Sequence, residues 1–192
     1  MWNKFLQCLV VFILSISVSV NLANSGEFKS KSEQCTDINI DQNLIIEACS
    51  WLLNRSGLSI DFLFTVLRHR GEAFTNTGQY EQAINDFDTI LHKDPNNFRA
   101  LYQRGNAWRK KADFQRAIQD YSASLNLRPN YIHALNNRGA TWRLMGEFDR
   151  AIEDYDAALK IEPEFSEVLL NRGLIWSLKK EYDRAIGDYT AY

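Results

Sequence analysis

Residues 104–129 read RGNAWRKKADFQRAIQDYSASLNLRP, and residues 138–163 read RGATWRLMGEFDRAIEDYDAALKIEP. The two stretches begin 34 residues apart and share an arginine–glycine start, a tryptophan, an alanine, a tyrosine and a final proline. A fixed period of this length indicates one supersecondary unit that is copied along the chain. Such units bury their apolar faces against their neighbours, which favours a surface for holding another molecule over a pocket for chemistry.

Two residue types keep the period over most of the chain. The glycines that follow an arginine are Gly71, Gly105, Gly139 and Gly173, and the only prolines are Pro95, Pro129 and Pro163. Within each unit, apolar residues recur at spacings of three and four, which predicts two amphipathic helices. Each proline would end the second helix. Each glycine lies inside the first helix, where it costs about 1 kcal/mol relative to alanine, and we interpret it as a site of close helix–helix approach.

These residues resemble the tetratricopeptide repeat family. In one unit the family's pattern appears as Leu101, Arg104, Gly105, Trp108, Ala117, Tyr121 and Pro129. The resemblance implies an all-α fold, a right-handed superhelical solenoid of antiparallel helix pairs with 34-residue repeats. The repeats are expected at residues 64–97, 98–131 and 132–165, with an incomplete fourth at 166–192.

One departure from the family's pattern is systematic. An arginine precedes each periodic glycine, and an aspartate stands sixteen residues after each arginine. The pairs are Arg70 and Asp86, Arg104 and Asp120, Arg138 and Asp154, and Arg172 and Asp188. Fourfold repetition predicts an ion pair between the two helices of each repeat, with bidentate geometry. The alternative is a set of solvated charges.

The first 25 residues differ in composition from the rest. Lys4 is followed by an uncharged apolar stretch over residues 5–20 and by small and polar residues at 23–25. This order is typical of a secretory signal peptide and predicts an exported, periplasmic or extracellular protein without stable membrane insertion. The alternative is an uncleaved N-terminal membrane anchor, because the apolar stretch approaches a membrane-spanning length. Together with the repeats, this layout looks like a group of secreted bacterial repeat proteins.

Residues 26–63 form an N-terminal segment with a degenerate helical half-repeat. Apolar residues at helical spacing predict a helix over residues 43–53 with Asp41 as its cap. Cys35 and Cys49 are the cysteines outside the signal segment, and export predicts a disulfide between them. The alternative is two unpaired core cysteines. No histidine lies near them in the sequence, which argues against a metal site.

Composition and motifs narrow the function. The formal net charge of -2 gives no support for nucleic acid binding, which usually requires a clustered basic face. The sequence shows no nucleophile motif, metal cluster or glycine-rich phosphate loop, so we expect neither an enzyme nor a cofactor. A docking region of a longer enzyme is the alternative.

The resemblance places the first helices on the concave side, where a protein or peptide partner would bind. The residues on that face are Arg99, Tyr102, Asn106, Arg109, His133, Asn136, Arg143, Leu170 and Leu174. This groove is polar and mildly cationic in its middle and turns apolar toward the C-terminus. We therefore expect an exported interaction scaffold that binds peptide segments with acidic groups. The alternative is a solvated helix surface without a ligand.

Two further features bear on the partner. Some family members clamp the C-terminal carboxylate of heat-shock chaperones, but Tyr102, Glu167 and Asn171 replace basic residues of that clamp here, which disfavours this function. The fourth repeat leaves an apolar edge at Ile186, Tyr189 and Tyr192. A structural module that self-associates through this edge is a further alternative.

Overall fold

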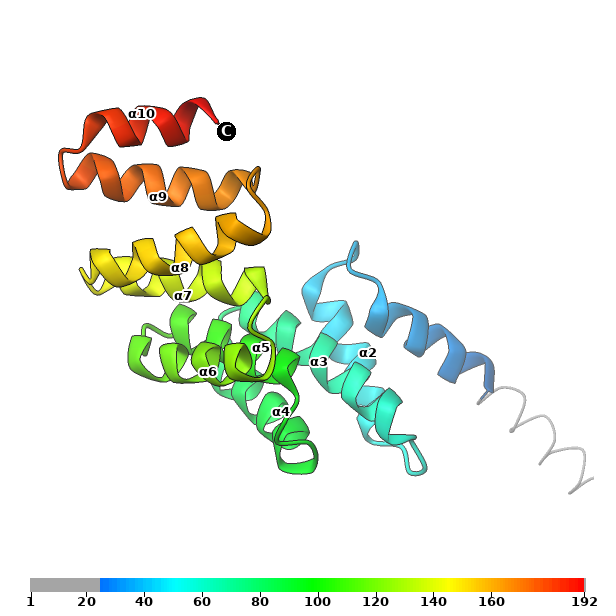
Figure 1. Ribbon diagram of the computed structural model, residues 1–192. Coiled ribbons are helices and arrows are strands. Elements are labelled where there is room, and N and C mark those ends of the chain that lie inside the picture. Colours follow the sequence, from blue (N-terminus) through cyan, green and yellow to red (C-terminus); the bar gives the residue numbers. More distant parts are fainter. Residues whose placement is uncertain (1–24, 192) are drawn as a thin grey trace, which may run out of the picture. The chain divides into compact units, whose positions relative to one another are not determined.

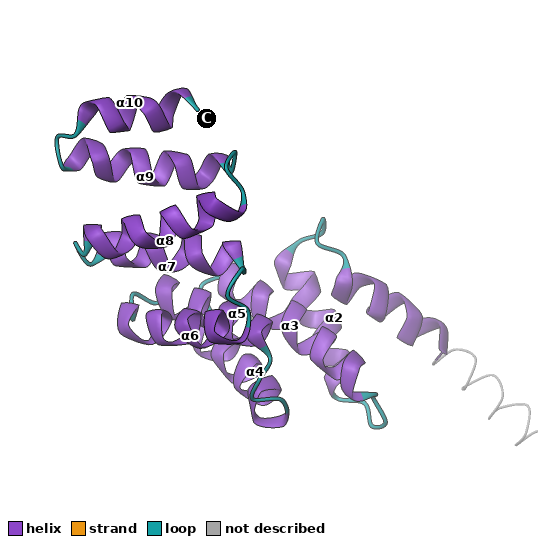
Figure 2. Ribbon diagram, viewed as in Figure 1, coloured by secondary structure: helices purple, strands orange, loops and turns teal. Residues whose placement is uncertain are grey.

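The computed structural model describes residues 25–191, and every regular element in that range is a helix (Figures 1 and 2). The described residues form two compact units, which are divided between Arg70 and Gly71. The expected signal peptide and Tyr192 lie outside the described residues. Among the residues that are described, no helix is long and apolar enough to cross a membrane.

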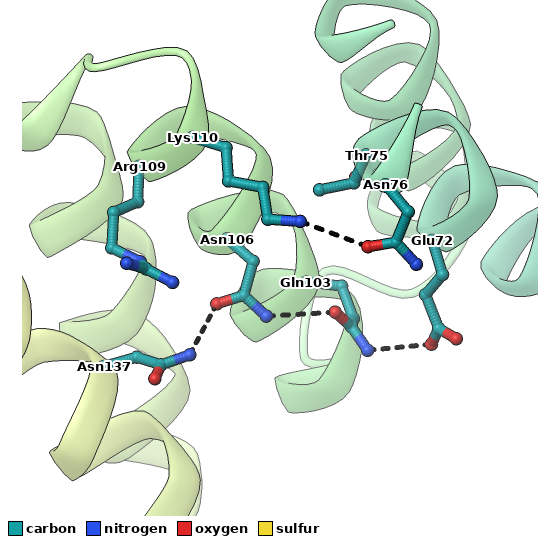
Figure 3. Close-up of a pocket in the computed structure, with 8 residues that line it drawn as sticks. All are labelled: Glu72, Thr75, Asn76, Gln103, Asn106, Arg109, Lys110 and Asn137. Carbon is teal, nitrogen blue, oxygen red and sulfur yellow. Dashed lines mark hydrogen bonds between the residues drawn. The ribbon is translucent and has the colours of Figure 1, made fainter. Parts of the chain in front are cut away.

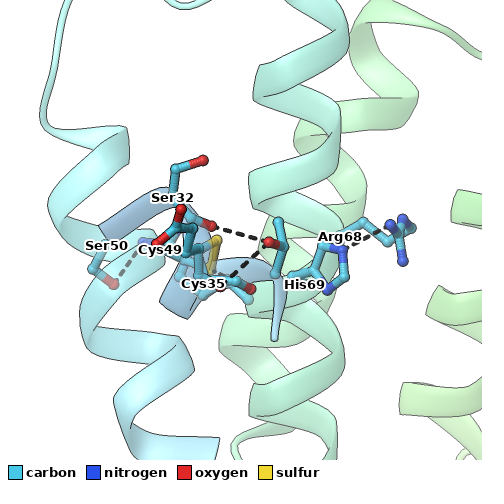
Figure 4. The surroundings of a disulfide bond; sticks show 9 residues. Ser32, Cys35, Cys49, Ser50, Arg68 and His69 are labelled. Atoms are coloured by element: carbon cyan, nitrogen blue, oxygen red, sulfur yellow. Dashed lines mark hydrogen bonds between the residues drawn. A yellow bond between two sulfur atoms is a disulfide. The ribbon is translucent and has the colours of Figure 1, made fainter. Parts of the chain in front are cut away.

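The first unit contains a helical stretch over residues 25–36, then α2 (Gln42–Leu53) and most of α3 (Ile60–Asn76). The expected cap is present, since the Asp41 carboxylate accepts a hydrogen bond from the Asn43 backbone N–H at 2.8 Å. The predicted disulfide is also present: Cys35 and Cys49 are joined, both are fully buried, and their Cα atoms lie 4.9 Å apart (Figure 4). The bridge ties residues 25–36 to α2.

The second unit is a stack of helices joined by short turns. Its helices are α4 (Tyr80–Lys93), α5 (Phe98–Lys110), α6 (Phe114–Leu127), α7 (Ile132–Leu144), α8 (Phe148–Ile161), α9 (Ser166–Leu178) and α10 (Tyr182–Thr190). Consecutive helices pack together, and the tightest pairs are the two helices of one repeat. In this unit α5 also contacts α7 and α7 contacts α9, whereas α6, α8 and α10 do not contact one another. The first helices therefore line the inner, concave side of the stack, and the expected solenoid of antiparallel pairs is confirmed.

The periodic glycines lie where the two helices of a repeat meet. A Cβ atom on Gly105 or Gly139 would come within 2.8 Å of the ring of Tyr121 or Tyr155 from the second helix. Real Cβ atoms essentially never approach other atoms so closely, so the absent side chain is what admits the ring. The predicted close approach is confirmed.

The arginine–aspartate pairs join the same two helices. Arg138 donates from Nε and Nη2 to the two carboxylate oxygens of Asp154 at 2.9 and 2.6 Å. Arg104 and Asp120, and Arg172 and Asp188, are paired in the same bidentate way. These three pairs confirm the prediction, whereas the pair of Arg70 with Asp86 would join the two units and stays a prediction.

Each of these arginines also reaches one repeat back. The Nη1 group of Arg138 donates to the Ser122 hydroxyl at 2.9 Å, and Arg104 and Arg172 donate to aspartates of the preceding second helix. One guanidinium thus bonds to two successive second helices. This arrangement ties neighbouring repeats together on one face of each first helix.

Candidate functional site

A polar cavity of about 260 Å³ opens on the face of the first helices in the second unit (Figure 3). It is lined by the last turn of α3, by α5 and by α7. The lining residues are Glu72, Thr75, Asn76, Gln103, Asn106, Arg109, Lys110 and Asn137. Most of them end in amide or charged groups, so the cavity is suited to hydrogen bonding with a polar ligand.

A chain of hydrogen bonds fixes the amides of this cavity (Figure 3). Asn137 donates to Asn106 at 2.8 Å, Asn106 donates to Gln103 at 3.1 Å, and Gln103 donates to Glu72 at 2.8 Å. The chain crosses from α7 through α5 to α3. Side chains held by several partners lose little further freedom when a ligand binds, and such preorganisation favours affinity.

A tyrosine of the second helix lies beneath the groove in each of the two middle repeats. The Tyr121 hydroxyl donates to Asn106 at 2.7 Å. The equivalent Tyr155 is also fully buried, but Ala140 takes the place of the asparagine and the Tyr155 hydroxyl has no hydrogen-bond partner. Burial raises the pKa of Tyr155 to about 12, and the neighbouring Arg143 guanidinium opposes this rise through its charge and its approach to the hydroxyl. The two repeats therefore differ in polarity at the floor of the groove.

Arg109 on α5 and Arg143 on α7 occupy the same position of successive repeats. Both are half-buried, and the Nε atom of each is buried without a hydrogen-bond acceptor. Within residues 25–191, no carboxylate lies within ion-pair distance of either guanidinium. Burial lowers the pKa of the neighbouring Lys110, and the charge of Arg109 adds to that effect. Arg109 and Lys110 thus bring two positive charges to a cavity whose lining contains one carboxylate, that of Glu72.

The structure brings several of the predicted groove residues together. Asn106 and Arg109 line the cavity, and the Tyr102 hydroxyl accepts a hydrogen bond from Asn137 at 3.1 Å. Arg143 lies on the next first helix. Leu170 and Leu174 follow on α9, where each is 39% exposed.

Arg99 and His133 do not line the cavity, but both lie near Tyr131, whose ring centre is 5.0 Å from that of the groove residue Tyr102. Arg99 is exposed at the start of α5, with its guanidinium 5.3 Å from the Phe98 ring centre. It is ten residues from Arg109, which corresponds to about 15 Å along the helix. His133 is exposed and packs edge-on against Phe165, with ring centres 6.0 Å apart.

Asn136 is only 2% exposed, so it does not face a ligand. It donates to Glu167 at 2.9 Å and accepts from Asn171 at 3.1 Å. Its amide therefore joins α7 to α9, and the groove position that we expected for it is taken by Asn137.

The sequence interpretation did not include Asn76, Gln103 or Lys110 among the groove residues. The helical face predicted from i+3 and i+4 spacing ended at Tyr102 and Arg109, whereas the face that lines the cavity also includes the next residue after each, Gln103 and Lys110. A usable signal was present, because Gln103, Asn137 and Asn171 stand 34 residues apart and all carry amides.

The cavity offers groups that can bind a polar ligand. Within the described residues, no group of three or more histidine, cysteine, aspartate or glutamate side chains could hold a metal ion. The cavity presents one guanidinium, one ammonium and one carboxylate group beside amides that can donate and accept. It can neutralise an anionic group and hydrogen-bond a polypeptide backbone.

Sequence profiles described as tetratricopeptide repeat match residues 70–132 and 133–165, together half of the chain. The chain belongs to the tetratricopeptide repeat family. Proteins with these repeats are typically non-enzymatic scaffolds for protein–protein interaction, and this function agrees with the polar groove of the present repeats. No curated protein matches the chain by sequence.

Solved structures share the tetratricopeptide fold. A crystal structure of MamA is 24% identical, with a TM-score of 0.68, and the match covers 79% of this chain and 86% of that one. MamA from Desulfovibrio magneticus RS-1 is 20% identical, with a TM-score of 0.71, over 85% and 89% of the two chains. The first tetratricopeptide repeat domain of Spaghetti (RPAP3), bound to the HSP90 peptide SRMEEVD, is 25% identical with a TM-score of 0.58, over 61% and 93%.

Proposed function

We propose that this tetratricopeptide repeat protein is an exported interaction scaffold whose groove over α5, α7 and α9 binds an acidic peptide segment of a partner protein. The observation that carries the proposal is the pair of uncompensated arginines, Arg109 and Arg143. A guanidinium presents a rigid, planar set of donors that matches a carboxylate in bidentate geometry. A half-buried guanidinium without a carboxylate of its own is therefore well placed to take one from a ligand.

The similar peptide-bound domain supports acidic chemistry but not an identical site. The peptide that Spaghetti (RPAP3) binds, SRMEEVD, contains three acidic residues. In the present chain Tyr102, Glu167 and Asn171 stand where chaperone-binding members carry basic residues, and Arg109 and Arg143 supply the charge at other positions. The proposed ligand is thus an acidic segment that is read by a different set of side chains.

Export is the second part of the proposal. The basic and then apolar layout of residues 1–25 supports it. The Cys35–Cys49 bridge supports it as well, because disulfides persist in oxidising compartments. Intact-mass measurement of the exported protein should give a mature chain that begins near Gly26. Retention of Met1 would instead indicate the N-terminally anchored form.

Peptide selection tests the groove. A random peptide display library that is screened against the chain should enrich sequences rich in aspartate and glutamate. The double variant Arg109→Glu, Arg143→Glu should lose this enrichment. The matched control Lys93→Glu, Lys160→Glu changes the net charge equally on exposed second-helix positions and should retain it. Equal enrichment by the two double variants would show that the groove is not the binding site.

Self-association is a second candidate function, which the outer face of α10 favours. Ile186 is 58% exposed, whereas its equivalent Ile152 in the preceding repeat is 8% exposed. Tyr182 and Tyr189 extend the same apolar face. If a second copy covers this face, light scattering should show a dimer that Ile186→Glu converts to a monomer. A wild-type chain that stays monomeric at high concentration would rule this candidate out.

A further inference from the structure

The inference rests on the proposed function and concerns the spacing of the charges that the groove accepts. Arg109 and Arg143 stand apart from the three paired arginines of the same helices. Arg104, Arg138 and Arg172 each hold a buried aspartate, whereas Arg109 and Arg143 pair with no carboxylate of the described chain. Both side chains are half-buried and the Nε atom of each is enclosed, so their stems are packed against the helices that carry them. Two charges carried on neighbouring helices favour a ligand whose anionic groups have a matching separation.

That distance follows from the packing of the first helices. Asn137 of α7 bonds to Asn106 of α5 at 2.8 Å, and Asn171 of α9 bonds to Asn136 of α7 at 3.1 Å, so the three helices are direct neighbours. Packed helix axes lie about 8–10 Å apart. We take residues at the same repeat position to be displaced by the step between their helices. On this basis we expect the two guanidinium groups to offer two anion sites about 8–10 Å apart across the groove.

The next step along the groove changes from charge to apolar surface. Ser177 of α9 stands at the repeat position of Arg109 and Arg143, so no third guanidinium follows. Leu170, Leu174 and Leu178 lie four residues apart on one face of α9 and are all exposed. An aliphatic side chain of the ligand would be buried here, beyond the two charges.

An extended peptide has a repeat that matches these steps. A polyproline II segment rises about 3.1 Å per residue and has three residues per turn. Side chains three residues apart therefore point the same way and lie about 9.3 Å apart. A β-strand brings side chains onto one face every two residues, about 6.8 Å apart, which is too short for the step between first helices.

We infer that the groove selects an extended acidic segment with two carboxylates three residues apart and an aliphatic residue three positions beyond the second. One carboxylate binds Arg109, the other binds Arg143, and the aliphatic side chain packs on the α9 leucines. The groove presents two positive charges followed by an apolar surface, so a peptide that binds in the reverse direction would place its aliphatic side chain on Arg109. The segment therefore binds in one direction.

Three fluorescein-labelled peptides test the spacing by fluorescence anisotropy. The matched peptide is a nonapeptide with blocked termini. It has glutamate at positions 2 and 5, leucine at position 8, and proline at the positions between these three residues. The shifted peptide has the same composition with adjacent glutamates at positions 2 and 3. The third is an alanine-based helical peptide with glutamates seven residues apart, a spacing of about 10.5 Å on a helix.

The matched peptide should bind about tenfold more tightly than the shifted one, because only one carboxylate of the shifted peptide reaches a guanidinium. Arg109→Gln should bring the two affinities to within about twofold of each other by removing the second site. Lys93→Gln, which removes one charge from the exposed end of α4, should leave the preference intact.

The remaining outcomes separate this inference from the proposed function. If the matched and shifted peptides bind equally and Arg109→Gln weakens both, the acidic groove stands and the spacing is wrong. Tighter binding of the helical peptide would also overturn the extended ligand while leaving the groove in place. If no peptide binds, or if Arg109→Gln and Arg143→Gln change nothing, both the groove and the spacing are wrong.

Discussion

Replacing Arg138 by alanine should lower the free energy of unfolding by about 3–5 kcal/mol, the usual cost of removing one partner from a buried ion pair. Asp154 is only 5% exposed and receives two hydrogen bonds from Arg138, at 2.9 and 2.6 Å. The variant would leave this carboxylate buried without its counter-charge. It would also remove the bond to Ser122, which lies on the preceding second helix.

Arg143→Ala provides the matched comparison, because it removes the same side chain from the same helix. Arg143 pairs with no carboxylate of the described chain, so its loss leaves no buried charge behind. The expected cost is about 1 kcal/mol or less, mostly from the packing of its stem. Urea unfolding followed by circular dichroism gives both values, provided that the slopes agree. Equal midpoints for the two variants would refute the stabilising role of the arginine–aspartate pairs.

The pH dependence supplies an internal check on the mechanism. Burial raises the pKa of Asp154, and the bonds from Arg138 oppose that rise. Without Arg138 the folded-state pKa should rise further. A carboxyl with a raised folded-state pKa binds its proton more readily when folded, so its cost is largest above that pKa and falls as the pH drops through it. The deficit of Arg138→Ala relative to wild type should therefore shrink between about pH 7 and about pH 4.

A double substitution separates the loss of pairing from the loss of packing. Arg138→Met combined with Asp154→Leu replaces both charges by apolar groups of similar volume, and such replacements are often neutral or stabilising. The double variant should recover most of the stability that Arg138→Ala loses. Failure to recover would mean that the ion pair itself, and not the uncompensated carboxylate, accounts for the cost.

Three further outcomes follow from particular contacts. Gly139→Ala should destabilise by about 1–3 kcal/mol, because its Cβ would lie 2.8 Å from the Tyr155 ring. Gly187→Ala has open space around its Cβ and should gain up to about 1 kcal/mol. A thermal midpoint of Gly139→Ala that is equal to or above that of Gly187→Ala would contradict this. Ala140→Asn should stabilise by about 1 kcal/mol in urea by giving the Tyr155 hydroxyl the acceptor that its equivalent has, and an unchanged midpoint would argue against an unsatisfied hydroxyl. Alkylation before reduction should label neither cysteine of the bridge in the exported protein, and two labelled thiols would exclude the disulfide.

The stacking contacts could be predicted from the sequence because each one recurs with the period. In a repeat protein every unit contacts only its neighbours. A pair such as Arg138 and Asp154, sixteen residues apart, therefore has the same geometry in each copy. The close approach at Gly139 and the ion pairs were both predictable for this reason. The disulfide was predicted instead from the expected export and from the cysteine count.

The groove could be predicted only in outline, because helical spacing places a residue on its own helix and not against the neighbouring one. Asn136 faces the groove side of α7 by spacing, yet it is buried because α9 covers it through Glu167 and Asn171. Gln103 was overlooked although it lies in the hydrogen-bond chain of the cavity. Which residue of a polar face is open depends on the lateral contact between first helices.

The positions that break the period carry the chemistry of the groove. Asn106 of one repeat becomes Ala140 in the next, and the arginine position becomes Ser177 in α9. Stacking requires neither change, since the glycine and the paired arginine are kept at all these repeats. A uniform solenoid would offer the same site at each step and could bind a ligand in several registers. Asn106 is replaced by the apolar Ala140 in the next repeat, and the arginine of α5 and α7 is replaced by Ser177 in α9. The two ends of the groove therefore differ in chemistry. This asymmetry can fix both the register and the direction of a bound peptide.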